Sequence, residues 1–350
     1  MAHRSPEQHE ARRLLMQWIF GSRATEVLVT ALRLNLPGLL GDGEADVADL
    51  ARSCDVPAAQ LNRLMRALAS LGLCTEPAPG RYALTEAGAL LRDEHPESLG
   101  DFARFHTSPV ALEPWSRLES SLRTGRTAFD EHFGVPLYAY FADKPELTAT
   151  FNSAMSQESN KVAAELPVSY DFGRYGTVMD VGGGDGTLLT SILRRHEGVR
   201  GVVFESAEGA AQAAGTVKAA GLEGRCSVAT GDFFRSVPAG ADLYVIKSVI
   251  HNWDDERAAT ILRNCREAMP EHGRLIVVDV VLPETVPAAS SDAPEINPYI
   301  KDLQMQILVS GKERTRADFE SLCATAGLRV TDVLPLPAYT GFSIVEAVRA

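Results

Sequence analysis

TVMDVGGGDGTLLTSILRRHEGVRGVVFE, residues Thr177 to Glu205, is the stretch from which the rest of this 350-residue chain is best understood. A short apolar run around Asp180 breaks at three consecutive glycines, Gly182 to Gly184, and then becomes a helical pattern of apolar residues. This order predicts a strand, a tight turn and a helix. Because glycine has no side chain, a ligand can lie on the backbone of the turn, where the free amides at the start of the helix favour a carboxylate or a phosphate.

The next apolar run, Val202 to Phe204, ends in Glu205, and an acid in this place commonly holds ribose hydroxyls. The ligand is therefore predicted to be a nucleoside. The dinucleotide fingerprint needs a glycine at the position of Thr187, but the next glycine is Gly186. The resulting pattern, D-x-G-x-G-x-G, resembles motif I of S-adenosylmethionine (SAM) dependent methyltransferases. The alternative is a glycine turn that only packs a helix against a sheet.

The composition is that of an ordinary globular protein long enough for two domains. There are 46 acidic and 34 basic residues, a formal net charge of -12, which argues against general binding to nucleic acid or anionic membranes. The five cysteines are widely spread and never form a C-x-x-C pair, so neither a disulfide framework nor a zinc site is predicted. Without a signal peptide pattern or an apolar run long enough to span a bilayer, we expect an intracellular, cytoplasmic protein.

The N-terminal region has two predicted parts. From Glu10 to Leu40 apolar residues recur at helical spacing, and Gly21 is the expected break between two helices. Their apolar face either packs on its own domain or, as we favour, forms a homodimer interface. Asp46 to Arg92 reads as helix, helix and hairpin, the order of a winged helix, yet it holds five acids and five arginines. A DNA reader would be basic, so a structural role is favoured.

The remaining chain predicts the architecture of an α/β protein. Leu99 to Leu166 is expected to be helical, and there His106 is a polar side chain among apolar ones that needs a partner. Continuous Val, Ile and Leu runs then alternate with helices, which predicts a Rossmann-like, doubly wound, mainly parallel sheet. We expect a mostly helical, winged-helix-like dimerisation domain over residues 1–172 and a catalytic domain over residues 173–350. Polar residues near the carboxyl ends of the strands mark the ligand site: Glu205, Asp232, Lys247, His251 and Asp279.

Six segments together resemble the small-molecule O-methyltransferases of the caffeate and hydroxyindole O-methyltransferase type, including bacterial relatives in aromatic natural-product and antibiotic pathways. They are FNSAMSQES, VMDVGGGDGTLL, GDFF, YVIKSVIHNWDDE, LIVVDVVLPE and SGKERTRADFESLCATAGL. The resemblance covers nearly the whole chain. It implies a homodimer that transfers a methyl group from SAM to a hydroxyl, leaving S-adenosylhomocysteine and using no metal.

The resemblance also assigns residues by motif. The implied SAM site is Ser159, Gly182, Gly184, Glu205, Asp232, Phe233 and Lys247. The implied catalytic residues are His251, with Asp279 and Glu313 beside it. The implied substrate-lining positions are His106, Asn152, Met155 and Met305. Position 205 is Glu where Asp is more usual, and position 279 is Asp where plant members often have Glu, which shortens the reach to His251.

A phenol must lose its proton during such a transfer, and a histidine is suited to take it at neutral pH. His251 is the predicted general base, although beside Asn252 and Asp254 it could also be a helix-capping residue. Asp254 and Asp255 lack further ligands at metal spacing, so they are expected to cap a helix. A nicotinamide oxidoreductase, a ligand-sensing winged-helix regulator and a SAM binder without transferase activity are the alternatives.

Overall fold

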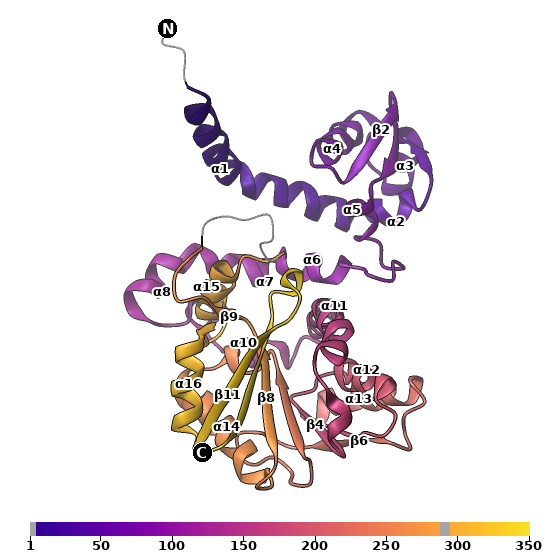
Figure 1. The fold of residues 1–350 in the computed structure, drawn as a ribbon. Coiled ribbons are helices and arrows are strands. Elements are labelled where there is room, and N and C mark those ends of the chain that lie inside the picture. The colour runs from indigo at the N-terminus through magenta and orange to yellow at the C-terminus, as the bar shows by residue number, and fades with distance from the viewer. Residues whose placement is uncertain (1–4, 288–294) are drawn as a thin grey trace. The chain divides into compact units, whose positions relative to one another are not determined.

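The computed structural model describes residues 5–287 and 295–350, which fall into two units (Figure 1). The first consists of the chain up to Leu112 together with Glu146–Gln157, and the second consists of Glu113–Pro145 and Glu158–Ala350. Helix α11, Pro145–Ser169, contributes to both units. The predicted domain boundary between residues 172 and 173 stays a prediction.

The first unit begins with α1, Pro6–Arg33, a single helix capped by Ser5. The predicted break at Gly21 is wrong. One glycine costs a helix only about 1 kcal/mol relative to alanine, too little to end a helix that is otherwise continuous. Five apolar side chains in the middle of α1 are exposed in the single chain: Leu14, Leu15, Trp18, Ile19 and Phe20.

The predicted helix, helix and hairpin of the first unit are present. Asp46 caps α3, Val47–Cys54, by accepting a hydrogen bond from the Ala48 amide, and the core is formed mainly by leucines of the helices. The strand β1 was not predicted, and it adds an edge to the hairpin. The other elements are α2 Leu36–Leu40, β1 Glu44–Asp46, α4 Ala58–Ser70, β2 Cys74–Ala78, β3 Arg81–Leu84, α5 Glu86–Ala89, α6 Gly100–His106 and α7 Pro109–Leu112.

The second unit is built on a seven-stranded sheet in the order β11-β12-β8-β7-β4-β5-β6. Five neighbouring strands are parallel, whereas β12 lies antiparallel to β8 and to β11, so the predicted mainly parallel sheet is confirmed. The bounds are β4 Thr177–Val181, β5 Arg200–Glu205, β6 Cys226–Thr230, β7 Leu243–Lys247, β8 Arg274–Asp279, β11 Leu328–Pro335 and β12 Ser343–Arg349.

Helices cover both faces of this sheet (Figure 1). Two separate groups of buried apolar residues result, one under α12 and α13 and the other under α14 and α16. Their bounds are α12 Thr187–Arg195, α13 Ala207–Ala219, α14 Asp255–Ala268 and α16 Arg316–Thr325. Burial on both faces explains why the strands read as unbroken apolar runs in the sequence.

The apolar run Leu275 to Val281, which the sequence pattern predicts as one strand, is divided in the structure. The sheet strand β8 ends at Asp279, and Val281–Leu282 form a separate short strand, β9, which pairs in parallel with β10, Arg314–Thr315. The reason is that β9 leaves the sheet to meet the chain that precedes α16. This pairing brings Glu313 close to the end of β8, a result that no local pattern contains.

Along the sequence, residues 113–145 of the second unit separate the two sections of the first, and they form short helices with turns at Gly125 and Gly134. They are η1 Glu113–Arg117, α8 Leu118–Thr124, α9 Ala128–Phe133 and α10 Leu137–Phe141. The segment Pro283 to Pro298 has no periodic pattern in the sequence, which predicts a surface loop. Its last residue begins α15, Pro298–Leu308, and residues 288–294 lie outside the described chain.

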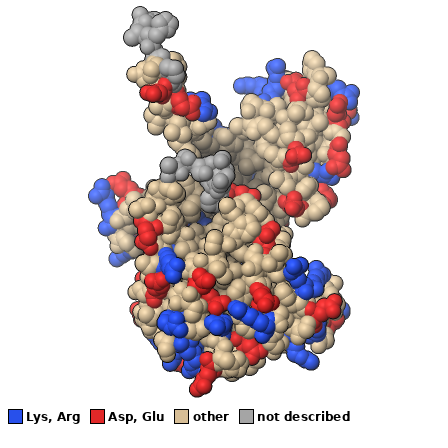
Figure 2. All heavy atoms as spheres, in the orientation of Figure 1, with Lys and Arg blue, Asp and Glu red and all other residues tan. Residues whose placement is uncertain are grey.

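The distribution of charged side chains and the state of the cysteines agree with the expectations from the composition. On the face drawn in Figure 2, acidic and basic side chains are interspersed, and no large area of one sign is seen among the described residues. All five cysteines are free thiols, and four of them are buried. Within the described chain, no helix has both the length and the apolar character needed to cross a membrane.

Candidate active site

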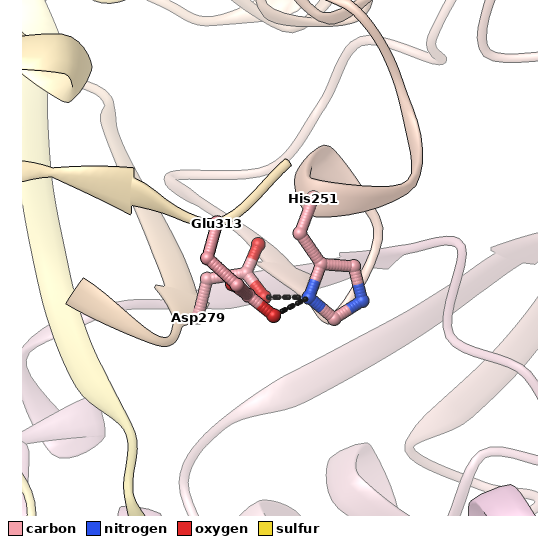
Figure 3. A group of neighbouring side chains, drawn as sticks. All are labelled: His251, Asp279 and Glu313. Atoms are coloured by element: carbon pink, nitrogen blue, oxygen red, sulfur yellow. Dashed lines mark hydrogen bonds and ion pairs between the residues drawn. The ribbon is translucent and has the colours of Figure 1, made fainter. Parts of the chain in front are cut away.

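His251 lies on η3, Ile250–Asn252, the short helix that follows β7, and is buried with 7% of its surface exposed. Its Nδ1 is 3.1 Å from Glu313 Oε1 and 3.1 Å from Asp279 Oδ1. Figure 3 shows both carboxyl groups on the Nδ1 side of the ring, with the other ring nitrogen directed away from them. The shorter side chain of Asp279 therefore still reaches the histidine.

The two carboxyl groups fix the tautomer of His251. A carboxylate can only accept a hydrogen bond, so the ring proton belongs on Nδ1, where it is donated to Glu313. One proton serves one acceptor, which is why the oxygens of Asp279 lie within ion-pair distance but have no aligned hydrogen bond. The neutral ring then keeps a lone pair on Nε2, and Nε2 is the atom able to accept a proton.

Burial and charge act in opposite directions on this group of side chains. Burial alone would lower the pKa of His251, but Asp279 and Glu313 outweigh it and raise the pKa above its ordinary value. Burial raises the pKa of Asp279, and the neighbouring Glu313 adds to that rise. Burial would also raise the pKa of Glu313, but the charges of His251 and Lys301 lower it. Glu313 is thus the more acidic of the two carboxyl groups beside the imidazole.

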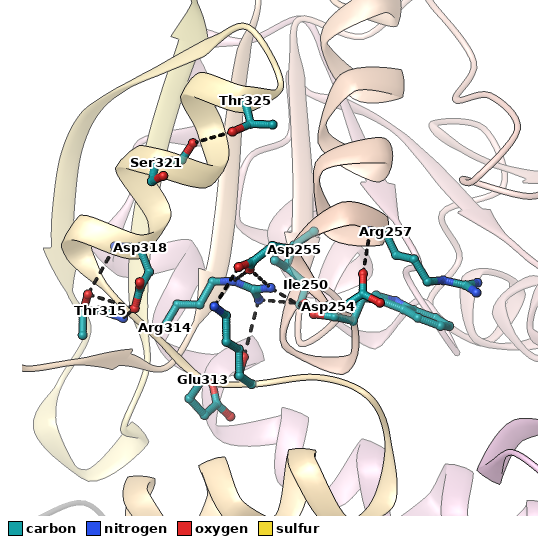
Figure 4. A network of polar contacts seen from close by, with 12 residues as sticks. Ile250, Asp254, Asp255, Arg257, Glu313, Arg314, Thr315, Asp318, Ser321 and Thr325 are labelled. Atoms are coloured by element: carbon teal, nitrogen blue, oxygen red, sulfur yellow. Dashed lines mark hydrogen bonds and ion pairs between the residues drawn. The ribbon is translucent and has the colours of Figure 1, made fainter. Parts of the chain in front are cut away.

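The segment containing Glu313 also holds the backbone of the histidine turn (Figure 4). Arg314 is buried and donates to the carbonyl oxygens of Ile250 at 3.1 Å and Trp253 at 2.9 Å. Its guanidinium also pairs with Asp255 at 2.8 Å. Asp254 caps α14 as predicted, whereas Asp255 is a partner of Arg314 and not a cap. Arg314 is therefore a positioning residue for His251.

His251, Asp279 and Glu313 together offer three potential metal-ligand atoms within 4.8 Å of one another. A cation is already supplied by the protein, because Lys301 Nζ lies 3.8 Å from Glu313 Oε1. A second cation at the same carboxylate would meet that ammonium group, and Nδ1 would have to lose the proton that it donates. The arrangement favours proton transfer over metal binding.

The glycine turn after β4 adopts a backbone that needs glycine. Gly182 and Gly184 have φ values of 71° and 56°, and a Cβ at Gly183 would lie 2.9 Å from the Asp180 carboxyl group. Glu205 closes the turn by accepting hydrogen bonds from the amides of Gly184 at 3.0 Å and Ser206 at 2.7 Å. The structure thus brings Gly182, Gly184 and Glu205 together as predicted, and leaves further lone pairs on the carboxylate.

Lys247, at the end of β7, connects this region to α11. Its ammonium group donates to Ser159 Oγ at 2.8 Å and to Ser248 Oγ at 3.2 Å, so two predicted site residues are in contact. Ser248 has a φ of 54°, a conformation that costs energy for any residue with a side chain, and such strain is concentrated at functional sites. Burial raises the pKa of the nearby Asp180 to about 7, an effect that Lys247 partly opposes.

Aromatic side chains follow β6. Phe233 would be 3.6 Å from a Cβ at Gly182, and its ring lies 6.5 Å from that of Trp253. Asp232 is directed into its own turn, where it accepts a hydrogen bond from the Phe234 amide. Arg257 covers the rings of Phe234 and Trp253 at 4.2 and 4.4 Å. Asp232 and Phe233 therefore lie beside the glycine turn at the carboxyl edge of the sheet.

The predicted substrate-lining residues are divided between the two units. His106 ends α6 in the first unit, half-buried, with its ring 4.2 Å from that of Phe102. Asn152 and Met155 are in the section of α11 that belongs to the same unit. Met305 is buried on α15 in the second unit. Their common role at one substrate stays a prediction.

Sequence reasoning missed the buried Lys301 on α15 and its half-buried partner Glu158 on α11, which form an ion pair at 3.5 Å. The sequence did contain a sign of this ion pair. Lys301 precedes Met305 by four residues in PYIKDLQMQIL, so a lysine shares the inward face of an apolar helix. A lysine at such a position needs a buried partner.

Comparisons with known proteins show the family of the chain. The chain matches the O-methyltransferase dimerisation domain over residues 16–93 and the O-methyltransferase domain over residues 115–329. It is 44% identical to the O-demethylpuromycin-O-methyltransferase of Streptomyces alboniger, over 99% of this chain and 92% of that protein. Among solved structures it resembles LaPhzM, with a TM-score of 0.89, 36% identity and coverage of 97% and 99% of the two chains.

A third relative was crystallised with ligands. NcsB1, an O-methyltransferase from neocarzinostatin biosynthesis, is 31% identical, with a TM-score of 0.76 and coverage of 93% and 96%, and its complex contains SAM and 2-hydroxy-5-methyl naphthoic acid. Both domain matches, the fold and the histidine site lead to one assignment. The chain belongs to the O-methyltransferase family and is a SAM-dependent O-methyltransferase with an N-terminal dimerisation domain.

Proposed function

We propose that this enzyme transfers the methyl group of SAM to a phenolic hydroxyl of an aromatic natural-product intermediate, with His251 as the general base. The observation that carries the proposal is the pair of buried carboxyl groups on Nδ1 of His251. They leave Nε2 as the proton acceptor and stabilise the imidazolium that forms when it takes a proton. A histidine that only capped a helix would not require two buried acids.

Methyl transfer to a phenol needs two contributions from the protein. Alignment of the hydroxyl oxygen behind the transferred methyl can supply about 7–11 kcal/mol of the barrier. A phenol has a pKa near 10, like tyrosine, so at neutral pH a positioned base contributes about 10²- to 10⁴-fold. Glu313 keeps the imidazole in the correct tautomer, and Asp279 adds negative charge that favours proton uptake.

The residues around the glycine turn fit a SAM molecule, which supplies an activated methyl group when bound. The open backbone at Gly182 and Gly184 suits its carboxylate, and Glu205 suits its ribose hydroxyls. Asp232 and Phe233 lie beside the turn, and Lys247 with Ser159 lies at the end of the adjacent strand. The NcsB1 complex with SAM supports the same choice of ligand.

We expect Glu205→Ala to weaken SAM binding at least about tenfold, or 1.4 kcal/mol. The variant loses both the ribose contact and the hydrogen bonds that Glu205 accepts from the glycine turn. Glu205→Asp is the matched control, since it keeps the charge at a position where the family more often has Asp. Calorimetric titration with SAM measures both. An alanine variant that binds SAM like the parent would remove Glu205 from the ribose site.

The dimerisation domain supports a homodimer, and we propose that the exposed apolar side chains of α1 form its centre. Trp18 is the largest of them, with 75% of its surface exposed in the single chain. Trp18→Glu should give monomer or aggregate, whereas Val168→Glu, an exposed apolar residue on α11, should leave the dimer intact. Light scattering should report twice the chain mass of 37.8 kDa for the parent, and a parent of single-chain mass would contradict the proposal.

The substrate is proposed as a flat hydroxylated aromatic, by analogy with the naphthoic acid bound to NcsB1. His106, Asn152, Met155 and Met305 are its proposed contacts. Incubation with SAM labelled in the methyl group and a panel of monocyclic and polycyclic phenols tests this by mass spectrometry. Label on a phenolic oxygen supports the proposal, and SAM binding without transfer to any phenol would indicate a family member that has lost transferase activity.

A further inference from the structure

Lys301 lies among charged groups of α11, β7 and β8 and of the segment that precedes β10. Its ammonium is 3.5 Å from Glu158 of α11 and 3.8 Å from Glu313, which precedes β10. It also lies 4.8 Å from the centre of the Phe342 ring. Asp279 at the end of β8 and Lys247 at the end of β7 act on it through space. Only 8% of the lysine surface is exposed, so these interactions are weakly screened.

Helix α15 holds Glu313 at two points. The side chain of Lys301 lies at its carboxylate, and the next residue, Asp302, accepts a hydrogen bond from its backbone amide at 2.8 Å. Glu158 ties the same ammonium to α11. The position of the acid beside His251 is thus determined by α15 as much as by its own strand.

We propose that Lys301 is a positioning residue that holds the Glu313 carboxylate beside His251 and sets the pH at which His251 accepts a proton, with Glu158 holding the lysine in place. This inference rests on the proposed role of His251 as the base and adds its electrostatic control. Glu158, Glu313 and Asp279 are the acids that act on Lys301, and Asp180 of β4 acts on Lys247, so this group holds four acids and two lysines. Proton uptake by His251 from a neutral phenol therefore places a positive charge where acids outnumber lysines.

The sign of the effect follows from the charges. Burial alone would lower the pKa of Lys301, but the three acids raise it, so the lysine stays cationic. Burial would raise the pKa of Glu158, but Lys301 and its neighbours lower it to about 2. A cation near His251 disfavours the imidazolium. Removing the charge of Lys301 should raise the pKa of His251, whereas Glu313→Gln, which removes an anion, should lower it.

The test is a histidine NMR titration of the full-length dimer, with the His251 signal identified by its absence in His251→Ala. Lys301→Met should move the titration of His251 to higher pH, Glu313→Gln should move it to lower pH, and Lys301→Arg should restore the parent curve. The transfer rate of Lys301→Met at pH 6.5 should fall about tenfold, and at pH 9 it should stay near that of the parent.

Lys161→Met is the matched control, because Lys161, on α11, also acts on Glu158 but pairs with Glu295. It should leave the His251 titration unchanged. If Lys301→Met does not fold, Lys301→Met with Glu158→Met removes both charges and should give a smaller shift of the same sign. A parent-like titration in whichever of these variants folds overturns the inference.

The titration also separates this inference from the proposed function. It reports the proton on His251 without any methyl transfer. A shifted titration together with full activity of His251→Ala would keep the role of Lys301 and remove that of the base. An unshifted titration together with an inactive His251→Ala would keep His251 as the base and remove the role of Lys301.

Discussion

His251→Ala should transfer methyl groups at least about 100-fold more slowly than the parent, because the variant lacks the atom that takes the phenolic proton. His251 makes none of the contacts proposed for SAM, which are formed by the glycine turn, Glu205 and Lys247. We therefore expect SAM affinity to change by less than about 0.5 kcal/mol, since only the transition state loses an interaction.

Single-turnover rates and SAM calorimetry on the same preparation check both parts of this prediction. Glu313→Gln should give a smaller loss of rate, because the amide still occupies the place beside Nδ1 without its charge. A large loss of SAM affinity in His251→Ala would show instead that the turn Ile250–Asn252 has collapsed, and the rate would then carry no information about the base.

Gly311→Ala should lower the transfer rate by about 100-fold as well, for a geometric reason. A Cβ at Gly311 would lie 1.9 Å from the carbonyl oxygen of His251 and 2.6 Å from the carbonyl carbon of Asn252. Backbone cannot yield as a flexible side chain can, so either the histidine turn or the Glu313 segment must move. The distance between His251 and Glu313 then changes, whereas the SAM residues are untouched.

Gly224→Ala is the control for Gly311→Ala, because a Cβ at Gly224 meets nothing within 4 Å. It should keep the parent rate. Gly311→Ala should also cost about 1–3 kcal/mol of stability through overpacking, which thermal unfolding measures. A Gly311→Ala enzyme with parent rate and parent stability would mean that the two segments are not held against each other.

Much of the fold could be predicted because its signals are local. The strands buried on both faces of the sheet are continuous apolar runs, and the glycines after β4 mark a turn that other residues cannot adopt. The break predicted at Gly21 failed because a local preference of about 1 kcal/mol was outweighed by the continuity of α1.

The sequence predicted which residues form the site, but not which residues hold them in position. His251, Asp279 and Glu313 were identified through motifs, and the structure places them in contact. The roles of Arg314 and Lys301 depend on which distant segments meet. The β9–β10 pairing and the Glu158–Lys301 ion pair join residues that are far apart in the chain, and neither leaves a periodic pattern in the sequence.

The pH dependence of the ratio between the parent rate and the His251→Ala rate tests the central claim most directly. The parent should lose activity as the pH falls through the raised pKa of His251, because a protonated imidazole cannot accept the substrate proton. The ratio should be large near neutral pH and shrink toward pH 10, where a phenol arrives already ionised. Equal rates for parent and variant from pH 6 to pH 10 would contradict the account and leave alignment as the only source of catalysis.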